Sequence, residues 1–369
     1  MKEANIASIS LVSPAPRRRV QAMKEYHPPL GCRDLLRLDF NENTFACSPK
    51  VREVLADISA GALTRYPERE PVEALVAAHL GLAAERVALT NGVDEAIHVL
   101  FEAFLEAGDE LLLPVPTYTM YEVYASATDA RVVAVQAGDD LQFPFEQLLA
   151  AITAKTKIIA IANPNSPSGS VATREQLLEI AQRAAQAVVL VDEAYFHFYG
   201  ETMVDLIGTV PNLIMARTFS KAYGLAGLRV GVLAGAVEMM RWVRRVLSPY
   251  SVNSIALACL PAALEDVTYL EWYVGEVLKA RGEFEAALDA VGLRWWTSRA
   301  NFILVEIGAR HAEFVQRMRA AGVLVRDRSS DPGCDGRVRI TIGTREQMRI
   351  AIDALSKAAE DLALGVHAK

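Results

Sequence analysis

The stretch Arg217-Thr-Phe-Ser-Lys-Ala-Tyr-Gly-Leu-Ala-Gly-Leu-Arg229 contains the pattern on which the prediction of fold and chemistry depends. Lys221 precedes Arg229 by eight residues in an apolar turn that glycines interrupt. A lysine amine can form a Schiff base with an aldehyde cofactor, and Ser220 and Arg229 could hold the phosphate of that cofactor. Most lysines are ordinary surface charges, so the segment needs support from elsewhere in the chain.

That support comes from two upstream segments, Asp192-Glu-Ala-Tyr195 and Asn163-Pro-Asn-Ser-Pro-Ser-Gly169. A site for pyridoxal 5'-phosphate needs a lysine, an acid at the ring nitrogen, donors at the phenolic oxygen, a phosphate cradle and a ring-stacking partner. The segments lie in an order that one large group of such enzymes uses. The pattern therefore favours a pyridoxal-phosphate site.

The composition is that of an ordinary globular enzyme, with 52% hydrophobic and 22% charged residues among 369. This length favours two domains. The net charge of −7 is modest, with no basic stripe for nucleic acid. No apolar run is long enough for a membrane span. The cysteines lack metal or redox spacing, so we expect a reduced cytoplasmic setting; they are Cys32, Cys47, Cys259 and Cys334.

The middle of the chain alternates short β-rich runs with helical patterns, which predicts a mostly parallel sheet with crossover helices. The expected strands are 86–90, 110–113, 131–135, 157–162, 188–191, 213–216 and 229–233, with a helix over 93–106. Continuous apolar strands such as Ile158–Ala162 are typical of a sheet that is covered on both faces. Ligands gather beyond the carboxyl ends of such strands. The segments at Asn91, Asn163, Asp192 and Ser220 all follow predicted strands, so we expect them to converge.

A second, smaller α+β unit is expected toward the C-terminus. A long helical stretch over 261–291 leads to predicted strands at 301–307, 323–326 and 337–342, with helices over 312–321 and 345–363. The N-terminal strand 36–40 is expected to join this unit. The predicted division is residues 1–45 joining the small domain, 46–250 as the large cofactor-binding domain, and 251–369 as the small domain.

Individual residues suit the cofactor's chemistry, each with a plainer alternative. Asp192 can keep a pyridine nitrogen protonated, although a strand-end aspartate can equally cap a helix. Tyr195 can donate to the phenolic oxygen or simply pack in a core. Gly92-Val-Asp94, between a strand and a helix, offers free amides and a favourable dipole to a phosphate. Tyr118 could stack on the ring.

The glycine-rich run 224–231 also invites comparison with a nucleotide-binding loop. It lacks the G-x-G-x-x-G spacing after a strand, which argues against that interpretation.

Taken together, the motifs resemble those of fold-type I pyridoxal-phosphate enzymes of the class I/II aminotransferase group, and most closely those of histidinol-phosphate aminotransferases. The resemblance runs from about residue 26 to the C-terminus. Besides the lysine and aspartate segments, it includes Leu38-Asp-Phe-Asn-Glu-Asn43, Arg65-Tyr-Pro-Glu68, Gly92-Val-Asp-Glu95, Pro116-Thr-Tyr118 and Arg339-Ile-Thr-Ile-Gly-Thr-Arg345.

The resemblance implies a role for each matching residue. Lys221 would be the Schiff-base lysine and the proton carrier, Asp192 would pair with the ring nitrogen, and Tyr195 would contact the phenolic oxygen. The phosphate would be held by the amides of Val93 and Asp94 with Ser220 and Arg229. Tyr66 would cross a homodimer interface to the partner's cofactor phosphate. The acidic end of the substrate would be bound by Arg339, with Arg326 and Tyr26 completing the pocket.

One position departs from the family pattern. The family usually has an asparagine where this chain has Ser166, and that amide donates to the phenolic oxygen of the cofactor. A shorter serine could reach the oxygen only through a water, or Asn165 could replace the donor after a local shift. Loss of one such donor would cost about 1 kcal/mol or somewhat more.

The resulting hypothesis is a ping-pong aminotransferase that moves an amino group from glutamate to imidazole-acetol phosphate. An aromatic or broad-range aminotransferase is the alternative, because such relatives share nearly all cofactor residues. A phospho-amino-acid decarboxylase is a further possibility. A regulatory protein that keeps the domain as a sensor is disfavoured, since only about 25 residues precede the resemblance, too few for a DNA-binding domain. A catalytically dead relative is disfavoured because the cofactor residues are present.

Overall fold

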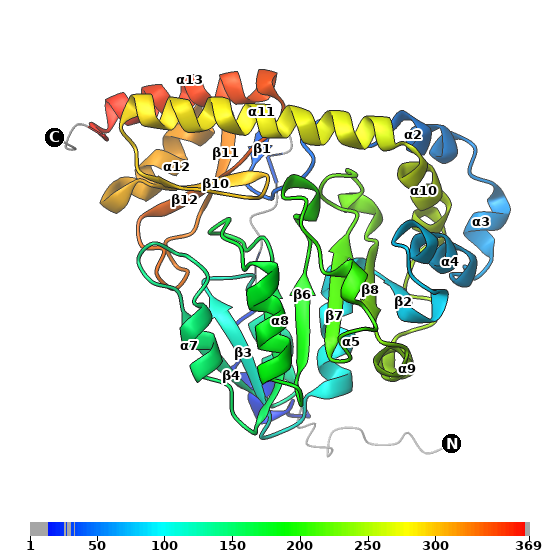
Figure 1. Cartoon of the computed structure of the whole chain (residues 1–369). Helices are drawn as coiled ribbons and strands as arrows, with labels where there is room; N and C mark the ends of the chain where they lie inside the picture. Colours follow the sequence, from blue (N-terminus) through cyan, green and yellow to red (C-terminus); the bar gives the residue numbers. More distant parts are fainter. Residues whose placement is uncertain (1–13, 26, 28–30, 33, 366–369) are drawn as a thin grey trace, which may run out of the picture.

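The computed structural model describes residues 14–25, 27, 31–32 and 34–365 and contains two β-sheets (Figure 1). The larger sheet has seven strands in the order β2-β8-β7-β6-β5-β3-β4, and the smaller has five in the order β1-β11-β12-β10-β9. Helices cover both faces of the larger sheet and one side of the smaller one. The predicted fold class, a mostly parallel seven-stranded sheet plus a smaller mixed unit, is confirmed.

The strands of the larger sheet begin and end close to the predicted positions. They are β2 (Val87–Thr90), β3 (Glu110–Val115), β4 (Arg131–Gln136), β5 (Thr156–Ala162), β6 (Val188–Asp192), β7 (Leu213–Thr218) and β8 (Gly231–Gly235). The last strand was expected to begin at Arg229. It begins two residues later because Arg229 has a left-handed backbone with φ of 53°, which a strand residue does not adopt.

One strand of this sheet is antiparallel. β8 runs opposite to both of its neighbours, β7 and β2, while β3, β4, β5, β6 and β7 pair in parallel. β2 therefore points the same way as β7. As a result the loop after β2, the loops after β5 and β6, and the connection from β7 to β8 all lie beyond one edge of the sheet.

Both faces of the larger sheet are buried, as the continuous apolar strands predicted. Leu112 points into one core and Leu111 and Leu113 into the other, which is the alternation of a strand covered on both sides. One face is covered by α5 (Gly92–Phe104), α6 (Met120–Ala127) and α9 (Val237–Val246). The other is covered by α4 (Glu70–His79), α7 (Phe145–Ala150), α8 (Arg174–Arg183) and α10 (Ser254–Glu265).

The smaller sheet joins the two ends of the described chain. β1 (Leu36–Leu38) pairs in parallel with β11 (Val323–Asp327), and β12 (Arg337–Thr341) lies antiparallel between β11 and β10 (Phe302–Glu306). The short edge strand β9 (Trp295–Trp296) was not predicted. The sheet packs with α12 (His311–Ala320) and α13 (Arg345–Asp361), and Thr344 starts α13 with a capping box to Gln347.

The prediction of one long helix over 261–291 was wrong about where the helix begins. The structure has two helices, α10 and α11 (Val267–Val291), separated at Asp266, whose side chain caps α11 by accepting from the Tyr269 N–H at 3.3 Å. Pro261 lies inside α10 and does not begin a helix. In Figure 1, α11 runs across the top of both units, so it connects the two cores.

Three remaining helices lie near the N-terminus. They are α1 (Arg18–Ala22), α2 (Pro49–Ala56) and α3 (Ala60–Thr64). α10 packs against α2 and within the larger core, although it follows residue 250. The domain boundaries at 45 and 250 stay predictions.

Candidate active site

Lys221 lies in the connection between β7 and β8, at the edge where the strand ends converge. Its Nζ donates to the main-chain oxygen of Phe40 at 2.9 Å, and it lies 6.0 Å from the ring centroid of Tyr195. Phe40 follows β1, which belongs to the smaller sheet. The lysine therefore lies between the two units, where side chains from both can reach one bound molecule.

Asp192 is the last residue of β6 and is buried. Its Oδ2 accepts from the Tyr121 hydroxyl at 2.6 Å and its Oδ1 from the Ala194 N–H at 3.0 Å. Burial raises the pKa of Asp192 from 3.8 to about 6, against the lowering effect of these two hydrogen bonds. Both partners are neutral. A buried carboxylate of this kind is suited to a cationic partner such as a protonated ring nitrogen.

Tyr195 is held by residues from the N-terminal segment and from β12. Its hydroxyl accepts from Asn41 Nδ2 at 2.9 Å, and Asn41 Oδ1 accepts from the Thr341 hydroxyl at 3.0 Å. The ring packs edge-on against Phe302 at 5.1 Å. The sequence pattern singled out Tyr195 but gave no role to Asn41 or Thr341.

The residues predicted to hold the cofactor phosphate, called the cradle below, lie together around the N-terminus of α5. Arg229 donates to Asp94 Oδ2 at 2.9 Å and to the Ser220 hydroxyl at 3.4 Å. Gly92 has φ of 73°, and a Cβ on it would lie 2.5 Å from a guanidinium nitrogen of Arg229. A Cβ on Gly231 would lie 2.8 Å from the Val93 amide nitrogen. The two glycines thus let the helix start, the arginine and β8 approach closely.

Tyr118 adjoins this cradle. Its hydroxyl donates to Asp94 Oδ1 at 2.7 Å, and burial beside that carboxylate raises its pKa. The ring meets that of Tyr121 edge-on at 5.9 Å. The aromatic face therefore lies between the cradle and Asp192, where a cofactor ring could stack on it.

Arg339, on β12, is enclosed by protein. It donates to the Ser166 hydroxyl at 2.9 Å and to the Asp39 main-chain oxygen at 2.7 Å, while its Nε has no partner among the described residues. Burial, with Arg328 nearby, lowers the pKa of Arg339 to about 10. An enclosed cation bonded to neutral groups is suited to an anionic ligand.

Asn165 does not have a free amide to replace the missing asparagine. Its Nδ2 donates to the Pro116 oxygen at 2.8 Å and to the Ser168 hydroxyl at 2.8 Å, and its Oδ1 accepts from Thr117 at 2.7 Å. These bonds fix the turn that presents Ser166 to Arg339.

Arg326 lies opposite Arg339 in the antiparallel pair β11–β12, so both side chains belong to one face of the sheet. Its guanidinium carbon lies 5.7 Å from the Phe40 ring centroid. Arg326 also lines a cavity of about 310 Å³ together with Tyr118, Arg328 and Asp331. Arg328 pairs with Asp331. The cavity therefore extends from Arg326 on the small sheet to Tyr118 beside the cradle.

Among the predicted residues that the structure describes, Tyr66 is not part of this cluster in the single chain. Tyr66 is 79% exposed in the single chain, and its ring packs on that of Tyr250 at 4.6 Å. Tyr26 lies outside the described residues.

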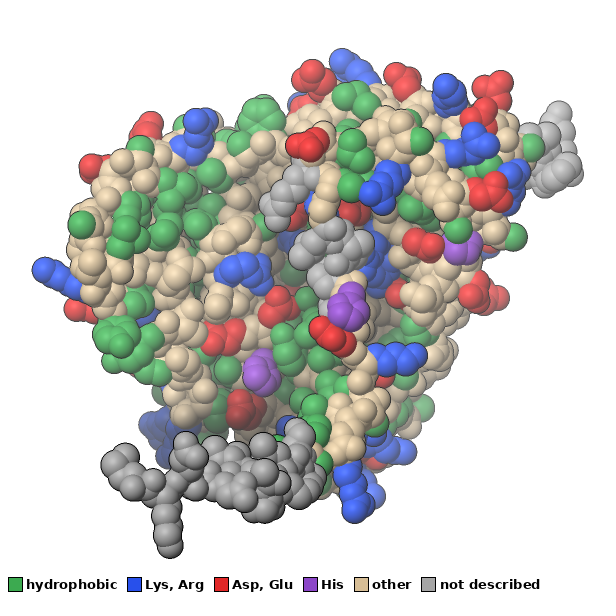
Figure 2. Space-filling view, turned by 180° about the vertical axis from the view of Figure 1, so that it is seen from behind, with side chains coloured by type: hydrophobic (Ala, Val, Ile, Leu, Met, Phe, Trp, Pro, Cys, Tyr) green, Lys and Arg blue, Asp and Glu red, His purple; other side chains and the backbone are tan. Residues whose placement is uncertain are grey.

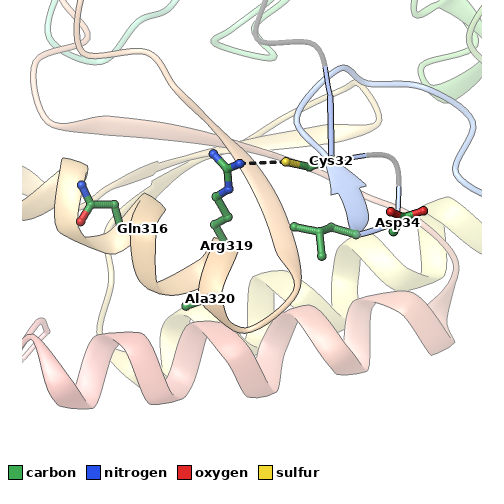
Figure 3. Close-up of a pocket in the computed structure, with 6 residues that line it drawn as sticks. Cys32, Asp34, Gln316, Arg319 and Ala320 are labelled. Carbon is green, nitrogen blue, oxygen red and sulfur yellow. Dashed lines mark hydrogen bonds between the residues drawn. The ribbon is translucent and has the colours of Figure 1, made fainter.

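A second cavity, of about 560 Å³, lies between the segment that precedes β1 and the end of α12 (Figure 3). There Arg319 donates to the Cys32 sulfur at 2.8 Å, with Asp34 and Gln316 also lining the hollow. None of the site residues described above lines this cavity.

Sequence reasoning missed Tyr121, Asn41 and Thr341. Tyr121, in α6, stands three residues after Tyr118, and Asn41 and Thr341 lie inside motifs that were quoted for other reasons. Their spacing in the chain does not indicate the hydrogen bonds that they make, because those bonds depend on how β1 and β12 pack against the loop after β6.

The chain matches the family model for aminotransferase class I and II over residues 33–355. It is 34% identical to the histidinol-phosphate aminotransferase of Thermoanaerobacter pseudethanolicus over 327 residues, covering 87% of this chain and 92% of that relative. The histidinol-phosphate aminotransferase 1 of Nostoc is 33% identical over 356 residues, covering 93% and 98%.

Solved structures agree with this match. The histidinol-phosphate aminotransferase of Sinorhizobium meliloti, solved in complex with pyridoxal-5'-phosphate, has a TM-score of 0.85 and 25% identity, covering 96% of this chain and 99% of that one. The protein described as a putative histidinol-phosphate aminotransferase from Erwinia carotovora has a TM-score of 0.85 and 26% identity, covering 90% and 98%. On this evidence the chain belongs to the class I and II aminotransferases.

Proposed function

We propose that this protein is a pyridoxal-phosphate-dependent histidinol-phosphate aminotransferase that exchanges an amino group between L-glutamate and imidazole-acetol phosphate. The observation that carries the choice of substrate is the placement of Arg326 directly opposite Arg339 on one face of the small sheet. The similarity to histidinol-phosphate aminotransferases along most of the chain supports it.

Two arginines in directly opposite positions repel each other, so the pair suits a ligand of high negative charge. A phosphate ester is a near-dianion with several acceptor oxygens, and guanidinium groups bind it in a bidentate manner. The carboxylates of glutamate carry single charges, and Arg339 alone could bind one of them. The same face can therefore take both substrates in turn, with Arg326 adding selectivity for the phosphate.

The residues at the sheet edge fit the cofactor. The cradle of α5, Ser220 and Arg229 would hold its phosphate, and Asp192 would meet its ring nitrogen. The bound cofactor withdraws electrons from the carbon that loses its proton. Lys221 would bond the cofactor at rest and carry that proton during transfer, since its amine lies at the convergence of both units.

We further propose a cytoplasmic homodimer in which Tyr66 reaches the partner's cofactor phosphate. Tyr66, Leu63 and Tyr250 are all exposed in the single chain. Figure 2 shows hydrophobic side chains gathered on the side that carries α2, α3 and α4 in Figure 1. Packing against a second copy would remove such a patch from water.

The test is a single-turnover titration of the protein loaded with pyridoxal 5'-phosphate. Loss of the visible band of the lysine-bound cofactor is followed with L-histidinol phosphate, L-histidinol and L-phenylalanine. We expect conversion at far lower concentrations of histidinol phosphate than of the other two amines. Arg326→Leu should raise the concentration of L-histidinol phosphate needed for conversion by about 10- to 100-fold, because the ester loses one guanidinium partner. The concentration of L-histidinol needed should stay nearly unchanged.

A preference for phenylalanine would instead make the protein an aromatic aminotransferase, and the phosphate assignment would be wrong. Release of carbon dioxide from a phosphorylated amino acid would indicate the decarboxylase alternative. Equal responses to histidinol and its phosphate ester would remove the role given to Arg326.

A further inference from the structure

Asn41 lies at the junction of the two units and has an unusually complete set of hydrogen bonds. Its N–H donates to the Thr341 hydroxyl oxygen at 3.0 Å, its Oδ1 accepts from that hydroxyl at 3.0 Å, and its Nδ2 donates to the Tyr195 hydroxyl at 2.9 Å. Its main-chain oxygen accepts from Asn301 at 3.2 Å. Asn41, Thr341 and Asn301 are all buried.

These contacts determine which way the Asn41 amide faces. The Thr341 hydroxyl is buried and makes two hydrogen bonds, both with Asn41. Its oxygen accepts from the Asn41 N–H, and its hydrogen is donated to Asn41 Oδ1. If the amide were turned over, Oδ1 would leave Thr341 and the hydroxyl hydrogen would lose its acceptor. A buried donor without a partner is costly, so the amide keeps its NH₂ group toward Tyr195.

An amide NH₂ can only donate, so the Tyr195 oxygen must accept from Asn41. The hydroxyl hydrogen of Tyr195 then has to point elsewhere, and it stays available as a donor to a bound molecule. Ser166 Oγ, at the position where the family pattern has a donor, accepts from Arg339 at 2.9 Å, and both amide hydrogens of Asn165 have acceptors. The hydrogen of the Ser166 hydroxyl also stays free, but the short serine would reach the phenolic oxygen only through a water, so Tyr195 is the residue that could donate to that oxygen directly.

We propose that Asn41 is a positioning residue that directs the Tyr195 O–H toward the phenolic oxygen of the cofactor, with Thr341 holding the Asn41 amide in place. The proposal rests on the cofactor role given to Tyr195 above. It makes the N-terminal segment and β12 part of the electronic control of the cofactor, although neither would touch the ring.

The test uses the visible absorbance of the lysine-bound cofactor, which reports the protonation of the Lys221 nitrogen, titrated against pH. A donor on the phenolic oxygen competes with the Lys221 proton for that oxygen and lowers the midpoint. Tyr195→Phe should therefore raise the midpoint by about one pH unit. Asn41→Asp offers Tyr195 an acceptor in place of a donor, so its O–H turns away from the cofactor. The midpoint should rise by a similar amount.

The decisive comparison is the double variant. If Asn41 acts through the Tyr195 hydroxyl, Asn41→Asp should cause no further rise in the Tyr195→Phe background. A rise that persists there would mean that the new carboxylate acts by its charge alone, and the proposal would be wrong. Thr341→Val, which frees the amide to turn, should give a smaller rise that also vanishes without the hydroxyl.

Asn43→Asp is the matched control, because Asn43 is in the same segment but donates to the Ala222 oxygen and the Tyr269 hydroxyl. It should leave the midpoint near that of the unmodified protein. If Tyr195→Phe raises the absorbance midpoint and Asn41→Asp leaves it unchanged, only the positioning role of Asn41 is overturned. An unchanged midpoint in Tyr195→Phe overturns the cofactor role of Tyr195 as well. The substrate preference is measured separately and is unaffected by either result.

Discussion

The buried carboxyl of Asp192 leads to a prediction with an unusual sign: removing its charge should stabilise the protein when no cofactor is bound. Burial raises the pKa of Asp192 from 3.8 to about 6. A folded pKa above the ordinary value means that this group's contribution to stability is present below pH 3.8 and is lost as the pH rises through about 6. At 1.36 kcal/mol per unit, the loss is about 3 kcal/mol near neutral pH.

Asn in place of Asp192 keeps the shape and an acceptor for the Ala194 N–H, and it carries no charge. In cofactor-free protein at about pH 8, Asp192→Asn should therefore raise the melting temperature by roughly 4 °C, using about 2.1 cal/mol/K per residue over 369 residues. The gain should fall to roughly half at about pH 5. Scanning calorimetry at a series of pH values measures both.

Adding pyridoxal 5'-phosphate should reverse the order. In the proposed site a protonated ring nitrogen would lie beside Asp192 and supply the cation that the carboxylate lacks, so the cofactor should stabilise the unmodified protein more than Asp192→Asn. Glu193→Gln is the control, because Glu193 is equally buried but pairs with Arg217 at 2.7 Å. Breaking that pair should destabilise the protein by about 3–5 kcal/mol. Equal melting temperatures for the unmodified protein and Asp192→Asn at pH 8, or an offset independent of pH, would refute the reasoning.

Three further experiments test the remaining parts of the site. Tyr121→Phe removes the hydrogen bond that lowers the Asp192 pKa, so the upper end of the pH window of the Asp192 effect should rise by about one unit or more in the same calorimetric series, while its lower end stays near pH 3.8; an unmoved upper end would contradict this. Gly92→Ala combines a positive φ with a close approach to Arg229, and it should cost about 1–3 kcal/mol and weaken cofactor binding measured by fluorescence. Gly227→Ala, whose Cβ would meet nothing within 4 Å, should change neither. Lys221→Ala and Tyr66→Ala should each be nearly inactive, but an equal mixture that exchanges subunits should regain about a quarter of the full activity, since half the dimers would hold one intact site. No recovery would remove the role of Tyr66 across the interface.

Much of the larger sheet could be predicted because its strands are short apolar runs between turn signals. Ile158–Ile161 is buried on both faces, and such a run has one simple explanation in a two-sided sheet. The two-residue strand β9 left no comparable signal. Pro261 suggested the start of a helix, because proline is favoured in the first turn. The real start is set by Asn253, whose side chain accepts from the Ala256 N–H at 2.8 Å.

The residues that come from one loop were the easier part of the site to predict. Ser220, Lys221 and Arg229 are close in sequence, and their roles follow from their own chemistry. The opposition of Arg326 and Arg339 depends on the register of β11 against β12, and one residue of slip would place Arg326 on the other face. Asn41 and Thr341 are 300 residues apart, and nothing local in either segment indicates their contact.

The convergence of the site has a topological cause that composition alone does not reveal. In a fully parallel sheet the chain would have to cross over between β7 and β8, and Arg229 would then lie at the opposite edge from Lys221. Because β8 is antiparallel, the chain turns back directly, and Ser220, Lys221 and Arg229 stay at the edge where β6 ends. The antiparallel pairing of β8 with β2 also brings the start of α5 to that edge. The reversed strand therefore keeps Arg229 beside Lys221, at the edge where Asp192 and the start of α5 also lie.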